Sequence, residues 1–355
     1  MRAEFGERRS EILFDPQQIS GYARFRIPGV IATAKGTLLA YCEARKSDGD
    51  WAEIDILLRR STDGGRTFSA PVVLVCGTKM KKTVNNPVMI AGNDGTAHFL
   101  CCVEYGVEDR GGGVFYRRST DEGATWSEPR DISSMTLPEL RNVFATGPGH
   151  GIELADGTLF VPCWTVLKKH GKKADSHHPG AVCALTSGDG GETWRIASFV
   201  PNGGVRDPNE TAAAQLPDGT VVLNIRDGNT HSRCCSVGAY GTTNEISALR
   251  TPLSALNDIS FSPVAVLPDV PDPVCCGGMI AANDTLYLTH CRDRENRRNL
   301  TLEQSADGVH WQELQVLDPG DAGYSDVAFC NGALYVAYEK GTAVVMTTVP
   351  IDIQT

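Results

Sequence analysis

Several features that mark common classes of protein are missing from this 355-residue sequence. It has no run of 18 uninterrupted apolar residues, so it offers no segment for a membrane-spanning helix. No stretch shows sustained helical periodicity. Basic residues are in deficit, with 33 Lys and Arg against 43 Asp and Glu, and the net charge of −10 argues against binding to nucleic acid or to an anionic membrane. An anionic ligand would therefore need a local cationic site.

A secretory signal and a Cys-x-x-Cys motif are also missing. The first twenty residues carry charges throughout and lack the apolar core of 7–15 residues that a signal peptide needs. Many of the twelve cysteines lie in apolar runs, which favours reduced, buried thiols over a disulfide or metal role. We expect a reducing, cytoplasmic compartment, and secretion only if a signal was removed before the first residue.

What the sequence does contain is an internal repeat. The phrase S-x-D-x-G-x-T-aromatic begins at Ser61, Ser119 and Ser187, and a shortened copy begins at Ser305. These starts are 58, 68 and 118 residues apart, which predicts a unit of about 60 residues with one decayed copy near position 246. Asp and Ser side chains in such a phrase close a turn, so we assign these boxes a structural role and no chemistry.

A second repeated phrase sets the number of units. A turn followed by an alternating apolar run occurs six times, as AKGTLLAY, NDGTAHFL, ADGTLFVP, PDGTVVLN, ANDTLYLT and CNGALYVA. Asp-Gly and Asn-Gly between such runs are strong hairpin signals because both residues accept a positive φ. A unit of about 60 residues fits four short strands and their loops. The sequence therefore predicts an all-β fold, a six-bladed β-propeller with four antiparallel strands per blade.

Functional residues are expected where the repeat is interrupted. Five places stand out because they put charged residues or a tyrosine on first strands or adjoining loops. These are Arg26 in a strand-like run; Arg45 with Asp48 and Asp50 in an acidic loop; Glu210 with Arg226 sixteen residues later; the run Arg292, Arg294, Arg297 and Arg298; and Tyr324 where the last blade begins. Each alone is typical of an exposed or packing residue.

Jointly, these segments closely resemble the sialidases (neuraminidases), retaining exo-glycosidases of glycoside hydrolase family 33. The shared features are the Arg-Ile-Pro motif at Arg26, the Asp boxes, the spacing of Glu210 and Arg226 around an L-x-D-G turn, and the segments Arg-x-Asn-Leu-Thr and Tyr-Ser-Asp. The resemblance is to a bacterial-type exo-α-sialidase and covers the chain from Tyr22 to Glu339. It implies that residues 1–355 form a single catalytic propeller domain.

The resemblance also implies roles for particular residues. Arg26, Arg226 and Arg297 correspond to the arginine triad that holds the substrate carboxylate, and Arg45 lines the pocket. Asp50 corresponds to the acid/base, Tyr324 to the nucleophile and Glu210 to the residue that polarises it. Two alternatives stay open: Asp48 competes with Asp50, and Arg298 competes with Arg297. The family requires no metal and no cofactor for catalysis, and its substrates are sialylated oligosaccharides or glycoproteins.

These residue types suit an anionic sugar. A guanidinium makes two parallel charge-assisted bonds to a planar carboxylate. A carboxylate nucleophile would be repelled by the substrate carboxylate, whereas a tyrosine activated by a neighbouring base avoids this repulsion.

The sequence leaves several alternative functions and sites open. The same pocket would suit a related keto sugar acid, transfer of the sialyl group to a hydroxyl as in a trans-sialidase, or a non-catalytic sialic-acid-binding propeller. His150 lines the pocket or serves as a packing histidine. The basic segment 168–178, which ends in His177 and His178, is predicted to be a surface loop, with contact to an acidic glycan or a metal as alternatives.

Overall fold

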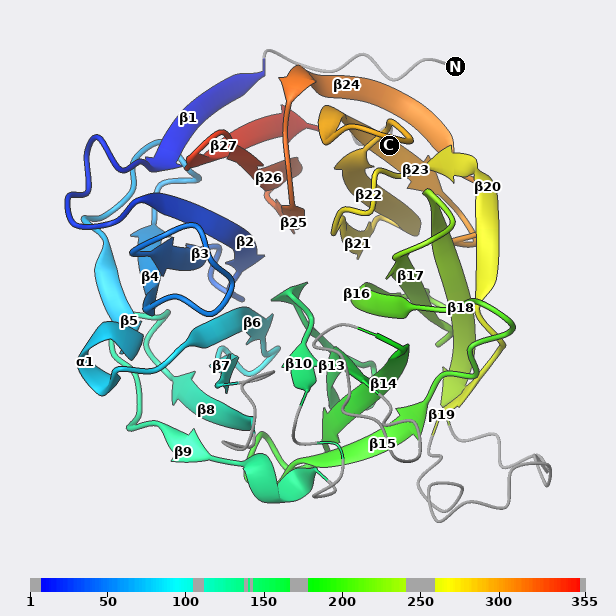
Figure 1. Ribbon diagram of the computed structural model, residues 1–355, viewed down its shortest axis with the longest axis horizontal. Coiled ribbons are helices and arrows are strands. Elements are labelled where there is room, and N and C mark those ends of the chain that lie inside the picture. Colours follow the sequence, from blue (N-terminus) through cyan, green and yellow to red (C-terminus); the bar gives the residue numbers. More distant parts are fainter. Residues whose placement is uncertain are drawn as a thin grey trace.

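The computed structural model describes residues 8–104, 112–136, 140, 143–166, 178–240 and 259–351. Six sheets, each with a core of four antiparallel strands, form a ring, which confirms the predicted six-bladed propeller (Figure 1). The expected decayed repeat near position 246 and the segment 168–177 lie outside the described residues.

The first three blades follow one another along the chain. Blade 1 consists of β2 (Arg24–Ala32), β3 (Leu38–Arg45), β4 (Ile54–Ser61) and β5 (Val72–Cys76). Blade 2 consists of β6 (Val84–Ala91), β7 (Ala97–Val103), β8 (Gly113–Ser119) and β9 (Arg130–Asp131), with β11 (Gly149–His150) added parallel to β6. Blade 3 consists of β10 (Phe144–Thr146), β13 (Leu159–Val166), β14 (Gly180–Ser187) and β15 (Arg195–Phe199), and β12 (Ile152–Glu153) pairs with β13.

The remaining blades close the ring. Blade 4 consists of β16 (Pro208–Gln215), β17 (Val221–Asp227), β18 (Ser232–Tyr240) and β19 (Ile259–Phe261), with β20 (Ala265–Pro271) also paired to β18. Blade 5 consists of β21 (Gly278–Ala282), β22 (Thr285–Cys291), β23 (Arg298–Ser305) and β24 (Gln312–Asp321). Blade 6 consists of β25 (Ser325–Cys330), β26 (Ala333–Lys340), β27 (Ala343–Pro350) and β1 (Arg9–Phe14). The short helices are α1 (Gly77–Met80) and the 3-10 turn Ser133–Met135.

The N-terminal strand was not anticipated from the sequence. β1 pairs antiparallel with β27, so the first and last strands of the chain lie side by side at the rim of the ring (Figure 1). The segment RSEILF is short and charged at its start, and its buried end, Leu13 and Phe14, packs in the core between blades 6 and 1. Blade 6 is thereby assembled from both ends of the chain.

The hydrophobic core is divided among the six interfaces between neighbouring blades. β3 illustrates why, because its side chains alternate between two interfaces: Leu38 and Ala40 pack toward blade 6, whereas Leu39 and Tyr41 pack toward blade 2. All twelve cysteines are free thiols and all except Cys76 are buried, as predicted. Within the described part of the chain, no helix has the length and apolar character needed to cross a membrane.

The Asp boxes have the predicted structural role. In the box at Ser119, the Asp121 carboxylate accepts hydrogen bonds from the Thr125 hydroxyl (2.6 Å) and amide (2.8 Å), and Trp126 donates to the Gly123 carbonyl at 3.1 Å. The bonds that Asp121 accepts, led by that of the Thr125 hydroxyl, lower the pKa of Asp121 to about 2. Each box joins the third and fourth strands of its blade.

His150 is a packing histidine at the inner edge of the ring, and it is not among the residues that line the pocket. Its Nδ1 lies 2.7 Å from Asp326 Oδ1, and the other oxygen of Asp326 accepts the Val30 amide at 3.0 Å. This buried pair therefore joins strands of three blades. Burial opposes a charge on the imidazole, but the Asp326 carboxylate outweighs it and raises the pKa of His150.

From the His150–Asp326 pair we predict that the stability of the folded protein depends on pH. The folded-state pKa of His150 is raised, so its pair with Asp326 stabilises the folded protein fully below the ordinary histidine pKa of about 6.5. That stabilisation is lost as the pH rises through the pKa of His150 in the folded protein. At pH 6 we expect the free energy of unfolding of His150→Asn to be about 3 kcal/mol below wild type. Urea unfolding from pH 5.5 to 9 should show this difference shrinking, and a difference that stays constant with pH would contradict it.

Candidate active site

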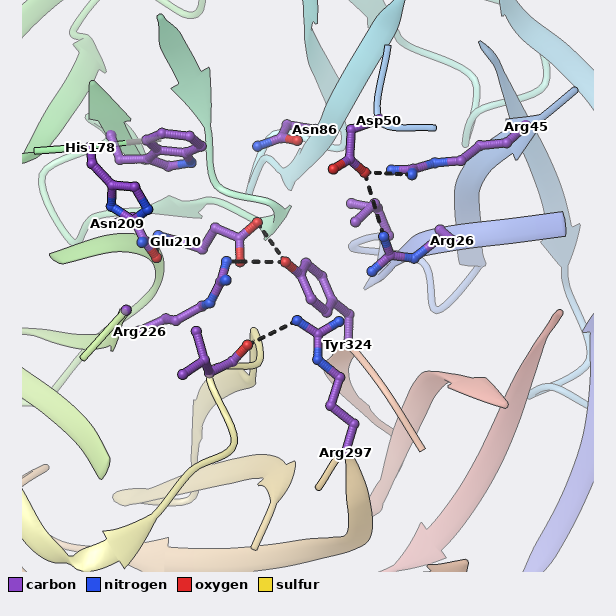
Figure 2. A pocket seen from close by; sticks show the side chains of 14 residues that line it. Arg26, Arg45, Asp50, Asn86, His178, Asn209, Glu210, Arg226, Arg297 and Tyr324 are labelled. Atoms are coloured by element: carbon purple, nitrogen blue, oxygen red, sulfur yellow. Dashed lines mark hydrogen bonds and ion pairs between the residues drawn. The ribbon is translucent and has the colours of Figure 1, made fainter. Parts of the chain in front are cut away.

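One pocket of about 360 Å³ is lined by residues from all six blades, which places it on the ring's central axis (Figure 2). It is lined by Arg26, Ile27, Arg45, Asp50, Asn86, Trp164, His178, Asn209, Glu210, Arg226, Gly228, Val274, Arg297 and Tyr324. All seven residues singled out in the sequence as the candidate site are among these. Segments up to about 300 residues apart thus converge in one cavity.

Tyr324 lies at the centre of the pocket, immediately before β25 (Figure 2). Its hydroxyl donates to Glu210 Oε1 at 2.9 Å and accepts from Arg226 Nη1 at 3.1 Å. Arg226 also donates to the second oxygen of Glu210. Burial raises the pKa of Tyr324 well above its ordinary value, so the free protein holds a neutral phenol with a base and a cation at its oxygen.

Three guanidinium groups surround the Tyr324 ring. Their central carbons lie 5.1, 6.0 and 5.2 Å from the ring centroid for Arg26, Arg226 and Arg297. Arg297 is held by a bond from Nη2 to the Val274 carbonyl at 2.9 Å. Burial opposes the charges of Arg26 and Arg226, but nearby carboxylates raise the pKa of both. The pocket therefore carries concentrated positive charge within a protein of net charge −10.

Arg26 is anchored by Glu339, a residue that the sequence analysis did not single out. Glu339 Oε1 accepts from Arg26 Nε at 3.1 Å and from the Ile27 amide at 2.9 Å, and Oε2 accepts from Arg26 Nη2 at 3.4 Å. Glu339 lies near the end of β26, on the last blade, whereas Arg26 lies on the first. Closure of the ring is what brings this pair together.

Asp50 lies at the opposite side of the pocket from Glu210, on the loop between β3 and β4 (Figure 2). Its Oδ1 accepts from Arg45 Nη1 at 2.7 Å and lies 3.6 Å from Arg26 Nη1. Arg45 is in turn bonded by Glu43 Oε2, which accepts from Nε at 2.8 Å and from Nη2 at 2.6 Å. Asp50 is therefore partly exposed at the edge of the pocket, and the Arg45–Glu43 pair that supports it is buried.

The structure distinguishes the competing candidates by position. Asp48 is 82% exposed and pairs with Arg24 on the surface, whereas Asp50 lines the pocket. Arg298 is 54% exposed and pairs with Asp293, whereas Arg297 lines the pocket. For the second pair the reason is chain direction, because Arg297 and Arg298 are adjacent at the start of β23 and successive side chains of an extended segment point to opposite sides.

β-Bulges direct several of these side chains into the pocket. The pairing register shifts between Arg26 and Gly29 on β2, between Asn85 and Val88 on β6, and around Glu210 on β16. Ile27 adopts φ 53° in the first of these bulges, a conformation that is costly for a β-branched residue. Such strain is typical of functional sites, and here the Glu339 carboxylate holds the Ile27 amide in place.

The pocket also contains residues that the sequence analysis missed. Asn86 has φ 50°, is buried, and its Nδ2 has no hydrogen-bond partner among the described residues. Trp164 and His178 line the pocket from blade 3. His178 was predicted to lie in an exposed segment with glycan contact as an alternative, and it is 51% exposed, precedes β14 and lines the pocket. A local signal for Asn86 was the Asn-Asn-Pro sequence before an apolar strand.

The described residues also bear on metal binding, which requires several ligating side chains arranged around one ion. Within those parts of the chain, no group of three or more His, Cys, Asp or Glu side chains is arranged to hold a metal ion. The lining side chains form a pocket that offers several guanidinium groups to an anion, a phenol bonded to a carboxylate, and a second carboxyl group across the cavity.

Comparison with known proteins gives matches over most of the chain. The family described as "BNR repeat-like domain" matches residues 36–336. A sialidase of Bacteroides fragilis is 27% identical, with 90% of this chain and 61% of that protein covered. A sialidase of Micromonospora viridifaciens is 28% identical, with 91% and 51% covered. These matches confirm the resemblance to sialidases, and the chain spans roughly half to two thirds of these two relatives.

Solved structures agree on the fold. The Hadza microbial sialidase Hz136 aligns with a TM-score of 0.76 and 23% identity, covering 93% of this chain and 66% of that one. The intramolecular trans-sialidase from Ruminococcus gnavus aligns with a TM-score of 0.71 and 15% identity, covering 97% of both chains.

Proposed function

The chain belongs to the BNR repeat-like domain family, and on that premise we propose that it is a retaining exo-α-sialidase. It would hydrolyse terminal sialic acid from sialylated oligosaccharides or glycoproteins through a covalent sialyl-tyrosine intermediate. The observation that carries this proposal is the Tyr324 hydroxyl, bonded to Glu210 and Arg226 in a pocket with three arginines. Sialidase relatives from two bacteria support the choice of substrate.

The arginines would bind the substrate carboxylate. Arg26, Arg226 and Arg297 approach Tyr324 from different blades, so a carboxylate among them would leave the attached anomeric carbon near the phenol oxygen. A hydrogen bond to a charged group is worth about 1.5–3 kcal/mol, so several can offset the loss of hydration of both partners. The triad thereby selects an anion and orients it.

Tyr324 would then attack the anomeric carbon. As the bond between its oxygen and that carbon forms, Glu210 takes the phenol proton over the 2.9 Å hydrogen bond, and Arg226 stabilises the developing negative charge. The bond from the anomeric carbon to the leaving oxygen breaks, and Asp50 supplies a proton to that oxygen. A phenol is neutral before attack, which avoids the repulsion a carboxylate nucleophile would face.

The second step would reverse these proton movements. Asp50 accepts a proton from water, the water oxygen bonds to the anomeric carbon, and the bond to Tyr324 breaks while Glu210 returns the proton to the phenol oxygen. Two displacements at one carbon retain its configuration. Asp50 suits this exchange because it is partly exposed at the pocket edge, where water and leaving group can enter and depart.

A turnover assay with product identification tests the proposal. The protein is expected to release the acid from sialyllactose, and proton NMR should show the α-anomer first. The β-anomer as first product would exclude the tyrosine intermediate. A 2,7-anhydro product would indicate transfer to the acid's own hydroxyl, and binding of sialic acid without turnover at any pH would indicate a binding propeller.

Glu339→Gln is expected to raise KM about tenfold with a much smaller change in kcat. The substitution removes the charge that neutralises and orients Arg26, while the side-chain volume is kept. One weakened charge-assisted contact accounts for a change of this size. Steady-state kinetics on sialyllactose measures it, and Glu192→Gln, which alters a surface pair with Arg118, serves as the control. An unchanged KM would contradict the anchoring role.

A further inference from the structure

His178 is a pocket residue for which the proposed mechanism has no use. Its side chain is 51% exposed, so it is not part of the core, yet it lines the cavity. In Figure 2 it lies beside Asn209, on the side of the pocket that holds Glu210 and Arg226, whereas Arg45 lies at the opposite side. A polar ring at that place faces whatever fills this end of the cavity.

The His178 ring is held in position by Asp207. His178 Nδ1 lies 3.2 Å from Asp207 Oδ1, while Asp207 Oδ2 accepts from Asn229 Nδ2 at 2.6 Å. The backbone of Asp207 is also bonded, since its amide donates to the Asp227 carboxylate at 3.1 Å and its carbonyl accepts the Gly228 amide at 3.3 Å. A carboxylate fixed on blade 4 thus orients an imidazole that arrives from blade 3.

Asp207, which holds the His178 ring, remains ionised. Burial disfavours an ionised Asp207, but the hydrogen bonds from Asn229 and His178 outweigh this and lower the pKa of Asp207. The carboxylate therefore remains an acceptor for the imidazole at neutral pH. A residue held in this way keeps its orientation when a ligand binds, which is the condition for a selective hydrogen bond.

The position of His178 relative to Asp50 indicates which part of the substrate it meets. In the proposed function, on which this inference rests, the leaving group departs past Asp50. The opposite end of the cavity, where His178, Trp164 and Asn209 lie, then holds the acid itself. Arg226 borders this end through its bond to Glu210, and His178 and Asn209 offer hydrogen-bonding side chains to the polar groups of the acid.

We propose that the His178 imidazole, oriented by Asp207, hydrogen-bonds a hydroxyl group of the bound acid on the side away from the leaving group. His178 is thereby a specificity-determining residue, and Asp207 is its positioning residue. A site built to bond a hydroxyl discriminates strongly against an analogue that lacks it. The pocket would therefore prefer acids with the full set of hydroxyls over deoxygenated or shortened analogues.

His178→Phe is the variant that tests this contact, because it keeps a planar ring and removes both nitrogens. We expect KM to rise about tenfold for sialyllactose and for a methylumbelliferyl sialoside alike, with kcat within about twofold, as for one lost hydrogen bond. Asp207→Asn should raise KM by a smaller factor and leave kcat unchanged. His310→Phe is the matched control, because His310 pairs with Asp307 at 2.7 Å but is 88% exposed and outside the pocket.

Substrate analogues locate the hydroxyl. Methylumbelliferyl sialosides with a shortened side chain, or without the 4-hydroxyl, are compared on both proteins. Wild type should discriminate against at least one analogue, and His178→Phe should lose that discrimination. Equal discrimination by the two proteins would overturn the inference, as would a rise in KM that depends on the leaving group.

Calorimetry with free N-acetylneuraminic acid separates this inference from the proposed function. If wild type binds the acid but hydrolyses no sialoside, the proposed function fails, and a Kd about tenfold higher in His178→Phe still supports the contact. If hydrolysis is observed and both proteins bind the acid equally, the inference fails alone. If wild type neither binds the acid nor hydrolyses a sialoside, both fail.

Discussion

Replacing Tyr324 with phenylalanine is expected to lower kcat for sialoside hydrolysis by at least about a thousandfold. The substitution keeps the ring that packs among Arg26, Arg226 and Arg297 and removes only the oxygen that bonds Glu210 and Arg226. No covalent intermediate can then form. The kcat of the purified variant on a fluorogenic sialoside, with mass spectrometry of the trapped wild-type intermediate, measures the effect.

A matched control for this experiment lies in the same blade. Tyr335 is also buried, and its hydroxyl donates to the Gly64 carbonyl at 3.2 Å, far from the pocket residues. Tyr335→Phe should therefore keep the wild-type kcat. Binding of the free acid by Tyr324→Phe should stay within a few fold of wild type, since the three arginines remain. A Tyr324→Phe protein that retains more than a tenth of wild-type kcat would contradict a tyrosine nucleophile.

The second large effect is expected for Asp50→Asn, and it should depend on the leaving group. An amide cannot donate the proton that a sugar oxygen needs on departure, so kcat/KM for sialyllactose should fall by about 10²–10⁴. A nitrophenyl sialoside has a leaving group that departs without protonation, and its first step should suffer far less. Steady-state and burst kinetics on the two substrates measure the difference.

Asp48→Asn is the control for Asp50→Asn. The two residues lie on one acidic loop, but Asp48 is 82% exposed and pairs with Arg24 on the surface. We expect Asp48→Asn to be as active as wild type on both substrates. Equal losses for both leaving groups in Asp50→Asn, or a large loss in Asp48→Asn, would show that the acid has been assigned to the wrong residue.

The architecture was largely predictable because its signals are local. A hairpin turn needs residues that accept a positive φ, and an Asp box closes on its own backbone, so each leaves a recognisable phrase within eight residues. Six turn phrases therefore predicted six blades. β1 left no such phrase, because a short strand at the rim becomes a strand only by pairing with β27 at the other end of the chain.

The pocket was predictable in part for a related reason. The seven residues carried over from the sialidase resemblance stand in distinctive short motifs, and all of them line the cavity. Glu339 was missed because a glutamate at the end of a strand is ordinarily a surface residue, and its partner Arg26 lies 313 positions away in sequence. His178 was not assigned to the site because it ends a polar segment whose composition is typical of an exposed loop.

The sequence by itself determined the number of blades, the buried and reduced state of the cysteines, and the residue types available for an anionic substrate. Those properties depend on turn chemistry and on hydrophobic alternation, which act over a few residues. Only the tertiary structure decided that β1 closes the ring, that Glu339 anchors Arg26, that Asp50 rather than Asp48 enters the pocket, and that Asp207 orients His178. Each of these depends on side chains from distant strands meeting, and that geometry exists only once all six blades share one axis.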